Sequence, residues 1–197
     1  MPERPTRPAL QERYDRRRQA MIASAAEAFA KRGYDQTTMQ DLAASMGLAT
    51  GAVYHYFDGK EKLLLAICDD LMEPLLARVR EINDSSPVDR LRALIRVWVA
   101  HVVEYSDHML VFQQERHVIE RDTQWRGVRE SRKAFERIVR DALLEALPDG
   151  EGTRDRRIEL GALLGMVNHT ALWCRPGGRL TTEEIADGYL GLILGPL

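Results

Sequence analysis

The sequence predicts an all-α protein in which an N-terminal three-helix domain of the helix-turn-helix type is joined to a C-terminal helical bundle. Three observations lead to this fold class. Apolar residues recur at helical spacing over most of the chain. Segment 34–63 holds two short helical patterns on either side of Gly47, followed by the polar start of a longer helix. Turn-forming residues at 83–87, 148–150 and 175–178 separate the longer helical patterns.

The composition is that of an ordinary globular protein. A chain of 197 residues, 45% hydrophobic and 29% charged, can bury one core, or one core and a small satellite domain. Its net charge of −2 gives no overall attraction to DNA, so any attraction must come from the placement of charges. The chain has no apolar run of the ~20 residues that span a membrane, no signal-peptide pattern, and only two cysteines. We therefore expect a cytoplasmic protein with no membrane partner.

The first 13 residues are predicted to form a flexible basic arm. Pro2, Pro5 and Pro8 favour an extended chain over a helix. The arm could follow DNA phosphates or enter the minor groove, or it could be a solvated tail. Residues 14–32 are then predicted as the first helix of an N-terminal domain that spans 14–62.

Residues 38–57 are predicted to form the helix-turn-helix itself. Thr38 can cap the first short helix, and Gly47 allows the sharp turn after it. The second helix, about 50–57, should pack on the first through Val53 and Phe57, which lie four residues apart. The second helix of such a motif enters the DNA major groove, so the pattern predicts DNA binding.

The candidate DNA contacts divide by position and chemistry. Lys60 stands at the start of the next helix, where Asp58 and Glu61 have capping-box spacing. A cation at this end opposes the helix dipole unless an anion is near, so Lys60 is predicted to bind a phosphate. Helix-end positions suit phosphates, and the start and middle of the second helix suit bases. We therefore assign phosphate contacts to Thr38, Tyr54 and Lys60, and base contacts to Thr50, Ala52 and His55. Gln40 could contact a phosphate or a base, and Gly51 would let the helix approach the DNA closely. Tyr56 could contact DNA or pack in the core.

Residues 63–197 are predicted to form the second domain. A helix at 60–83, interrupted by Pro74, is expected to lead into this domain. The other helices are expected at 87–105, 107–119, 122–147, 154–173 and 182–194. Ser86 and Pro87 suit the N-cap and first turn of the helix at 87–105. Thr181 or Thr182 with Glu184 can cap the last.

The last two helices are predicted to form a dimer interface. Gly161 and Gly165 allow close approach on one helix, and Ile185, Tyr189 and Leu192 make an apolar stripe on the other. Two such faces suggest an isologous four-helix interface. A homodimer would carry two reading helices to successive major grooves of an inverted repeat in double-stranded DNA.

The pattern T-T-x-x-D-L-A-x-x-x-G-x-x-x-G-x-x-Y-x-Y-F-x-x-K-E-x-L, which runs from Thr37 to Leu63, resembles the DNA-binding domain of TetR-family transcriptional regulators. It covers roughly the first third of the chain. The resemblance implies a bacterial repressor, a ligand-binding and dimerisation domain after residue 62, and a helix around Pro74 that transmits motion between the domains.

The run W-C-R-P-G-G-R-L-T-T-E-E-I-A, from Trp173 to Ala186, resembles a branch of TetR-like repressors of fatty-acid and sterol-ring catabolism. Their effectors are acyl-CoA thioesters, so we expect the effector to be an acyl-CoA thioester or another amphipathic small molecule, and we expect no cofactor. Such an effector needs an apolar slot for its acyl group and cations for its phosphates. Aromatic residues at helical spacing are more often part of a core, and arginines on long helices are usually solvated or could pair with nearby glutamates. The residues assigned to this pocket are Trp98, Val102, Tyr105, Met109, Phe112, Arg116, Trp125, Arg129, Asn168, Trp173 and Arg175.

Two other functions remain as alternatives. A TetR-like repressor of an efflux system, sensing lipophilic drugs, would need buried carboxylates, for which Glu104 and Glu115 are the candidates. A helical metal-dependent enzyme is less favoured, because no histidine pair has H-E-x-x-H spacing and no glycine-rich phosphate loop or nucleophile elbow is found. We therefore expect neither catalytic residues nor metal ligands.

Overall fold

The structure is a computed structural model, and it describes residues 8–83, 86–121, 123–147, 155–175 and 177–195. Over these ranges its regular structure is entirely helical, which confirms the predicted fold class. The helices in chain order are α1 (Pro8–Arg32), α2 (Met39–Ser45), α3 (Thr50–Tyr54), α4 (Lys60–Arg80), α5 (Pro87–Glu104), α6 (Ser106–Gln114), α7 (Arg116–Arg121), the 3-10 turn η1 (Thr123–Trp125), α8 (Arg126–Ala146), α9 (Arg156–Trp173) and α10 (Thr182–Leu194).

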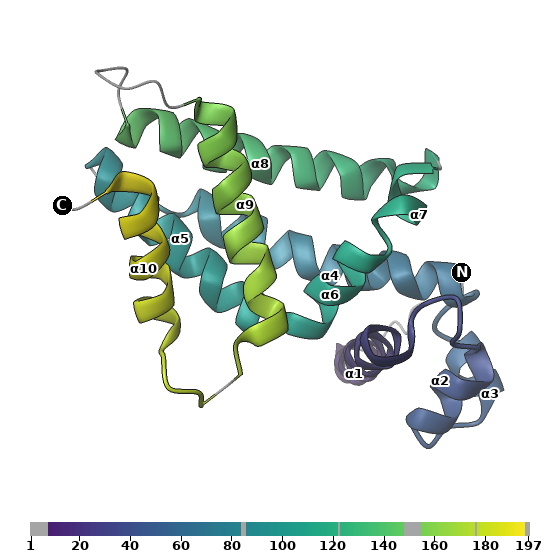
Figure 1. The fold of residues 1–197 in the computed structure, drawn as a ribbon. Helices are drawn as coiled ribbons and strands as arrows, with labels where there is room; N and C mark the ends of the chain where they lie inside the picture. The colour runs from purple at the N-terminus through teal and green to yellow at the C-terminus, as the bar shows by residue number, and fades with distance from the viewer. Residues whose placement is uncertain (1–7, 84–85, 122, 148–154, 176, 196–197) are drawn as a thin grey trace.

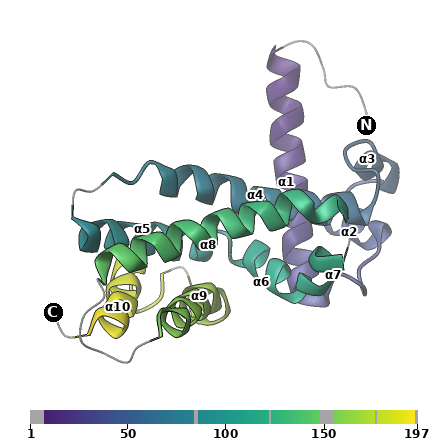
Figure 2. The same cartoon turned by 90° about the horizontal axis from the view of Figure 1, so that it is seen from above.

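The long helices α4 and α8 run along the molecule and connect its two ends. Helices α1–α3 lie at one end and α9 and α10 at the other (Figures 1 and 2). Helix α5 packs against α4, α8, α9 and α10, while α6 packs against both α1 and α9. Helix α6 therefore contacts elements of both ends.

Two apolar cores fill the molecule, and α4 passes through both. Leu63 to Cys68 contribute to the N-terminal core, and Leu71 to Val79 contribute to the C-terminal core. The division falls inside α4, a few residues beyond the expected boundary at 62/63. Four residues from beyond that boundary also enter the N-terminal core: Val111, Ile119, Trp125 and Val128. The two cores are thus joined by shared helices and not by a linker.

Helix α1 begins earlier than the sequence pattern indicated. The extended arm was expected to reach residue 13, but residues from Pro8 onward are helical, so this prediction is wrong for 8–13. Proline is compatible with the first turn of a helix, because the N–H that it lacks would have no partner inside the helix. The early part of α1 projects away from the other helices (Figure 2). Pro2 and Pro5 lie outside the described residues.

The predicted caps were right at some helices and wrong at another. Ser86 caps α5 and Thr181 caps α10 with the predicted capping box to Glu184. At α4, however, Gly59 is the N-cap, with φ of 140° and no side-chain cap bond, so the capping box of Asp58 is wrong. The predicted helix 107–119 is divided at Glu115 into α6 and α7.

Within the described ranges, no helix is both long and apolar enough to cross a membrane. In the same part of the chain, no group of three or more histidine, cysteine or carboxylate side chains is arranged to hold a metal ion.

Candidate DNA-binding surface and ligand cavity

The start of α2 is fixed by a reciprocal bond between Thr38 and Asp41. Thr38 Oγ1 accepts from the Asp41 backbone N–H at 3.1 Å and donates to Asp41 Oδ2 at 2.6 Å, while Thr38 N donates to the same carboxylate at 2.9 Å. These hydrogen bonds lower the pKa of Asp41. Thr38 is the N-cap that the sequence predicted, and it remains exposed at the surface. Its contact with phosphate stays a prediction.

Helix α3 is held to the domain by its own Val53 and by Phe57, which follows the helix. Val53 is fully buried and Phe57 is 3% exposed, as predicted for the helix contact. The helix is shorter than expected, because regular α-helix ends at Tyr54. The candidate DNA contacts Gln40, Gly51, Tyr54 and His55 are exposed, and Thr50, Ala52 and Tyr56 are half-buried.

A shallow groove runs between the start of α1 and α3. Tyr56 stacks on Tyr14, with ring centroids 4.6 Å apart, and two exposed arginines of α1, Arg13 and Arg17, line the same groove. The lining residues are Leu10, Arg13, Tyr14, Arg17, Met21, Ala52, His55 and Tyr56. The groove puts positive charge beside the candidate recognition helix, where it suits contacts with the phosphate backbone.

Lys60 is anchored within the domain. Its Nζ donates to the Tyr34 carbonyl at 2.7 Å and lies 4.2 Å from the centre of the Tyr34 ring. This contact ties the start of α4 to the loop between α1 and α2. Burial, followed by nearby negative charges, raises the pKa of Tyr34 to about 12. The phosphate contact of Lys60 stays a prediction, but the side chain also has a structural bond that the sequence pattern did not indicate.

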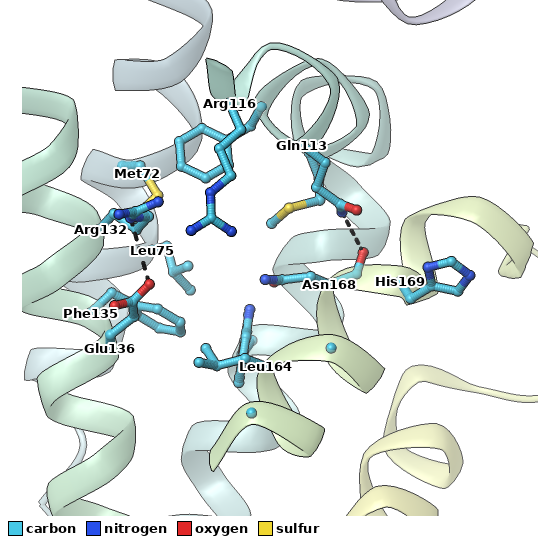
Figure 3. Close-up of a pocket in the computed structure, with 15 residues that line it drawn as sticks. Met72, Leu75, Gln113, Arg116, Arg132, Phe135, Glu136, Leu164, Asn168 and His169 are labelled. Carbon is cyan, nitrogen blue, oxygen red and sulfur yellow. Dashed lines mark hydrogen bonds and ion pairs between the residues drawn. The ribbon is translucent and has the colours of Figure 1, made fainter. Parts of the chain in front are cut away.

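The C-terminal domain contains a cavity of about 430 Å³ between α4, α5, α6, the start of α7, α8 and α9. Figure 3 shows the residues that line it. The apolar wall consists of Met72, Leu75, Trp98, Met109, Phe112, Phe135 and Leu164. The polar wall consists of Gln113, Arg116, Arg132, Glu136, Asn168 and His169, and Gly161 and Gly165 of α9 complete the lining. The volume lies within the range of roughly 300–1,000 Å³ that is typical of small-molecule sites.

Two arginines dominate the charge of the polar wall. Arg116 Nε donates to Glu120 Oε1 at 2.9 Å, and Arg132 Nη1 donates to the same atom at 3.3 Å. Arg132 Nε also lies 3.6 Å from Glu136 Oε1 (Figure 3). Hydrogen bonds from the two arginines lower the pKa of Glu120. An anionic ligand could therefore replace Glu120 as the partner of both guanidinium groups.

Comparison with known families identifies both halves of the chain. The model for "Bacterial regulatory proteins, tetR family" matches residues 21–67. The model for "Tetracyclin repressor-like, C-terminal domain" matches residues 84–197, which is more than half of the chain. The chain belongs to the tetR family. This confirms the predicted family.

Several relatives are similar to this tetR-family protein over nearly their full length. The transcriptional repressor KstR2 of Mycolicibacterium smegmatis is 28% identical over 200 residues, covering 98% of this chain and 94% of the relative. The structure of the ketosteroid transcriptional regulator KstR2 of Mycobacterium tuberculosis has a TM-score of 0.83 and 25% identity, covering 91% and 93% of the two chains. The structure of AibR in complex with isovaleryl coenzyme A and operator DNA has a TM-score of 0.75 and 31% identity, covering 92% and 100%.

The cavity of this tetR-family protein includes five of the eleven predicted pocket residues. These are Trp98, Met109, Phe112, Arg116 and Asn168. The other six do not line it. Val102 is buried in the C-terminal core and Trp125 in the N-terminal core. Tyr105 stacks on His101, and Arg129 donates to the Ile119 carbonyl. Trp173 and Arg175 are exposed.

Several cavity residues were missed by the sequence analysis: Met72, Leu75, Gln113, Arg132, Phe135, Glu136, Leu164 and His169. All eight lie in segments where the sequence predicted helices. The signal that could have found Arg132 is its spacing on α8, one turn before Phe135 and Glu136 on the same face.

Of the residues predicted to form the dimer interface, some lie at the surface and others in the interior. Leu192 is 71% exposed, and Gly161 and Gly165 are also exposed. Ile185, by contrast, is 4% exposed and belongs to the C-terminal core, so its assignment to the interface is wrong. Tyr189 is half-buried, and its hydroxyl lies 2.8 Å from Thr170 Oγ1 of α9. Both residues face inward because α10 packs on α5 as well as on α9.

Helix α6 links the cavity to the DNA-binding end. Its buried His108 has Nε2 3.2 Å from Asp70 Oδ2 of α4, and Gln19 of α1 donates to the same carboxylate. Burial opposes the ionisation of Asp70, but the contact with His108 and the hydrogen bond from Gln19 outweigh it and lower its pKa. On the cavity side, Gln113 of α6 donates to the Asn168 carbonyl of α9 at 2.9 Å. Asp70 is therefore a point where α1, α4 and α6 meet.

A second buried histidine meets α4 beside its proline. Pro74 lies inside α4 and lacks the N–H that a helix interior uses. His101 Nε2 lies 2.8 Å from the Leu71 carbonyl, so this nitrogen carries the proton, and Arg78 Nη1 lies 3.3 Å from Nδ1. Burial lowers the pKa of His101; the bond to the Leu71 carbonyl opposes this shift, and the charge of Arg78 adds to it. The neutral ring thus joins α5 to the backbone of α4.

Proposed function

We propose that this protein is a homodimeric, ligand-responsive transcriptional repressor that leaves an inverted-repeat operator when a CoA thioester enters the cavity. The observation that carries the proposal is the cavity itself, with an apolar wall beside two arginines. The acyl group would lie against the apolar wall, and the phosphates would bind Arg116 and Arg132. The cavity is too small for a whole CoA thioester, so the nucleotide would remain at its mouth.

Family membership and the AibR complex support the same effector class. AibR, similar over the whole length of its chain, has been solved with isovaleryl coenzyme A and operator DNA. In the present chain the cavity is walled partly by α6, which packs on α1. A ligand that binds one position of α6 better than another would shift the spacing of the two reading domains.

The arrangement of charges favours an anionic effector over a lipophilic cation. The lining residues of the cavity include two arginines and one carboxylate, Glu136, which lies beside Arg132. Of the two carboxylates expected for a drug-sensing pocket, Glu104 accepts from Arg78 at 2.8 Å, and Glu115 does not line the cavity. A cationic drug would therefore meet no carboxylate free to bind it among the lining residues.

Selection from a random duplex library, followed by fluorescence anisotropy, tests the proposal. We expect the selected DNA to be an inverted repeat bound by a dimer, and isovaleryl-CoA or octanoyl-CoA to release it, whereas the free acids and free CoA do so poorly. Arg116→Gln with Arg132→Gln should weaken thioester binding and leave operator affinity unchanged. Arg126→Gln is the matched control, because Arg126 forms the same kind of i,i+4 pair, with Glu130, but does not line the cavity. Binding of no thioester by a protein that binds its operator would refute the effector class.

A further inference from the structure

The short helix α7 carries a carboxylate that bonds both arginines of the cavity. Glu120 Oε1 accepts from Arg116 Nε at 2.9 Å and from Arg132 Nη1 at 3.3 Å. Both arginines line the cavity, whereas Glu120 does not. The Glu120 side chain is 46% exposed, so it can exchange these bonds for water at little cost. Glu120 is therefore an internal anion at the position where the proposed function places the effector's phosphates.

The bond between Glu120 and Arg132 also holds α7 against α8, because Arg132 belongs to α8. A second bond joins the two helices without a residue of the cavity, since Arg129 Nη1 donates to the Ile119 carbonyl at 2.8 Å. A helix of six residues is not stable by itself. The position of α7 therefore depends on such contacts, and one of them is made by a cavity residue.

Helix α7 and the turn η1 also contact the DNA-binding end of the molecule. Ile119 lies one helical turn after Arg116, is 2% exposed and belongs to the N-terminal core. Trp125 of η1 belongs to the same core. Gln124 of η1 donates to Glu61 Oε1 in the first turn of α4. A change in the position of α7 would therefore reach both the N-terminal core and the start of α4.

We propose that Glu120 is a latch that the effector opens. In the ligand-free protein its carboxylate holds α7 on α8 through the arginines of the cavity. The phosphates of the CoA thioester replace it as the partner of these arginines, which releases α7 and η1. The inference rests on the proposed function, and it adds how the bound effector changes the protein. A ligand without an anionic group cannot replace Glu120, so the latch also selects against neutral acyl compounds.

Glu130 provides a matched control within the same chain. Its Oε1 accepts from Arg126 Nε at 2.9 Å, in the same i,i+4 arrangement as the pair of Glu120 and Arg116. Neither Glu130 nor Arg126 lines the cavity. Glu130→Gln should therefore remove an exposed ion pair of the same kind without opening the latch.

The test measures hydrogen exchange and calorimetric affinity on wild type, Glu120→Gln and Glu130→Gln. Octanoyl-CoA should speed the exchange of the amides of α7 and η1 in wild type. Glu120→Gln should exchange these amides faster by a similar factor before any ligand is added, while α5 exchanges as in wild type, and Glu130→Gln should match wild type throughout.

The affinities separate the latch from the rest of the cavity. Glu120→Gln should bind octanoyl-CoA roughly 2- to 10-fold more tightly than wild type, because no carboxylate has to be displaced. Octanoyl-N-acetylcysteamine, a thioester of the same acyl group without phosphates, should bind all three proteins equally. Adding Arg116→Gln and Arg132→Gln to Glu120→Gln should abolish the gain in octanoyl-CoA affinity.

Three results would overturn the inference. Unchanged or weaker binding of octanoyl-CoA by Glu120→Gln would mean that the carboxylate does not compete with the ligand. Exchange of α7 and η1 that stays the same or slows when wild type binds octanoyl-CoA would mean that the ligand does not release this segment. An equal gain in Glu130→Gln would assign the effect to net charge. Failure of every thioester to bind wild type would instead refute the proposed effector class, and the inference with it.

Discussion

Replacement of Asp70 by asparagine should loosen the connection between the cavity and the DNA-binding end. The Asp70 side chain is 15% exposed and has His108 Nε2 3.2 Å away, so the lost charge is well shielded from water. Hydrogen bonds to charged groups contribute about 1.5–3 kcal/mol. Asparagine keeps one acceptor oxygen, and we therefore expect a loss of about 1.5 kcal/mol in the free energy of unfolding, which lowers Tm by roughly 3–6 °C for a chain of this size.

The sign of the pH effect follows from the lowered pKa of Asp70. A carboxylate with a lowered pKa contributes stability that is present above its unfolded pKa, about 3.9, and is lost as pH falls through the folded value. The contribution is therefore complete at neutral pH, where the assays are made. Wild type and Asp70→Asn should converge in Tm only in strong acid.

The functional readout is the ratio of operator affinities without and with saturating thioester. Such coupling ratios are typically about 5- to 150-fold, and substitutions between two sites change them by roughly 2- to 30-fold. We expect Asp70→Asn to reduce the ratio within that range, while calorimetry gives an unchanged thioester Kd. The neighbouring Asp69→Asn is the control: burial raises the pKa of Asp69, and its loss should leave both Tm and coupling nearly unchanged. A lowered Tm with unchanged coupling would refute transmission through Asp70.

Three further substitutions have distinct expected results. Lys60→Ala should weaken operator binding without changing thioester affinity and should lower stability by about 1 kcal/mol, because the bond to Tyr34 is lost; equal loss of both activities would indicate misfolding. His101→Gln should make the decline in Tm between about pH 7 and pH 5 less steep. Burial lowers the pKa of His101, so the stability that the neutral ring contributes is lost as pH falls below about 6.5. A decline as steep as that of wild type would contradict this. Gly165→Leu should keep or raise Tm, because a Cβ at this position meets nothing within 4 Å and leucine favours a helix over glycine by roughly 1 kcal/mol. The same substitution should weaken thioester binding, because the larger side chain fills part of the cavity. A monomer in light scattering would assign Gly165 to the dimer interface instead.

The helix-turn-helix could be predicted because its determinants are local. The cap at Thr38, the turn at Gly47, which has φ of 65°, and the buried Val53 each act within a few residues of chain. Errors arose where a local signal was ambiguous. Pro8 can begin a helix as well as prevent one, and Gly59 caps α4 where aspartate was expected.

The ligand cavity could be predicted only in part, because it depends on how distant helices pack. Periodicity shows which face of a helix is apolar but not which core that face meets. Trp125 therefore looked like a pocket residue, whereas it is buried against the N-terminal core. The sequence likewise did not indicate that Gly161 and Gly165 line the cavity, and their contact with a second copy stays a prediction. Ile185 faces inward because α10 packs on α5, a neighbour that no sequence pattern specified.

The central claim is that thioester binding and operator binding are coupled. Its most direct test is to measure thioester affinity by calorimetry with and without operator, and operator affinity by anisotropy with and without thioester. Thermodynamic linkage requires the thioester to lower operator affinity by the same factor by which operator lowers thioester affinity. We therefore predict that the thioester Kd is at least about fivefold weaker for the operator-bound dimer than for the free dimer, and that the two factors agree. An identical thioester Kd for free and operator-bound protein would contradict the account, because the cavity and the DNA-binding surface would then act independently.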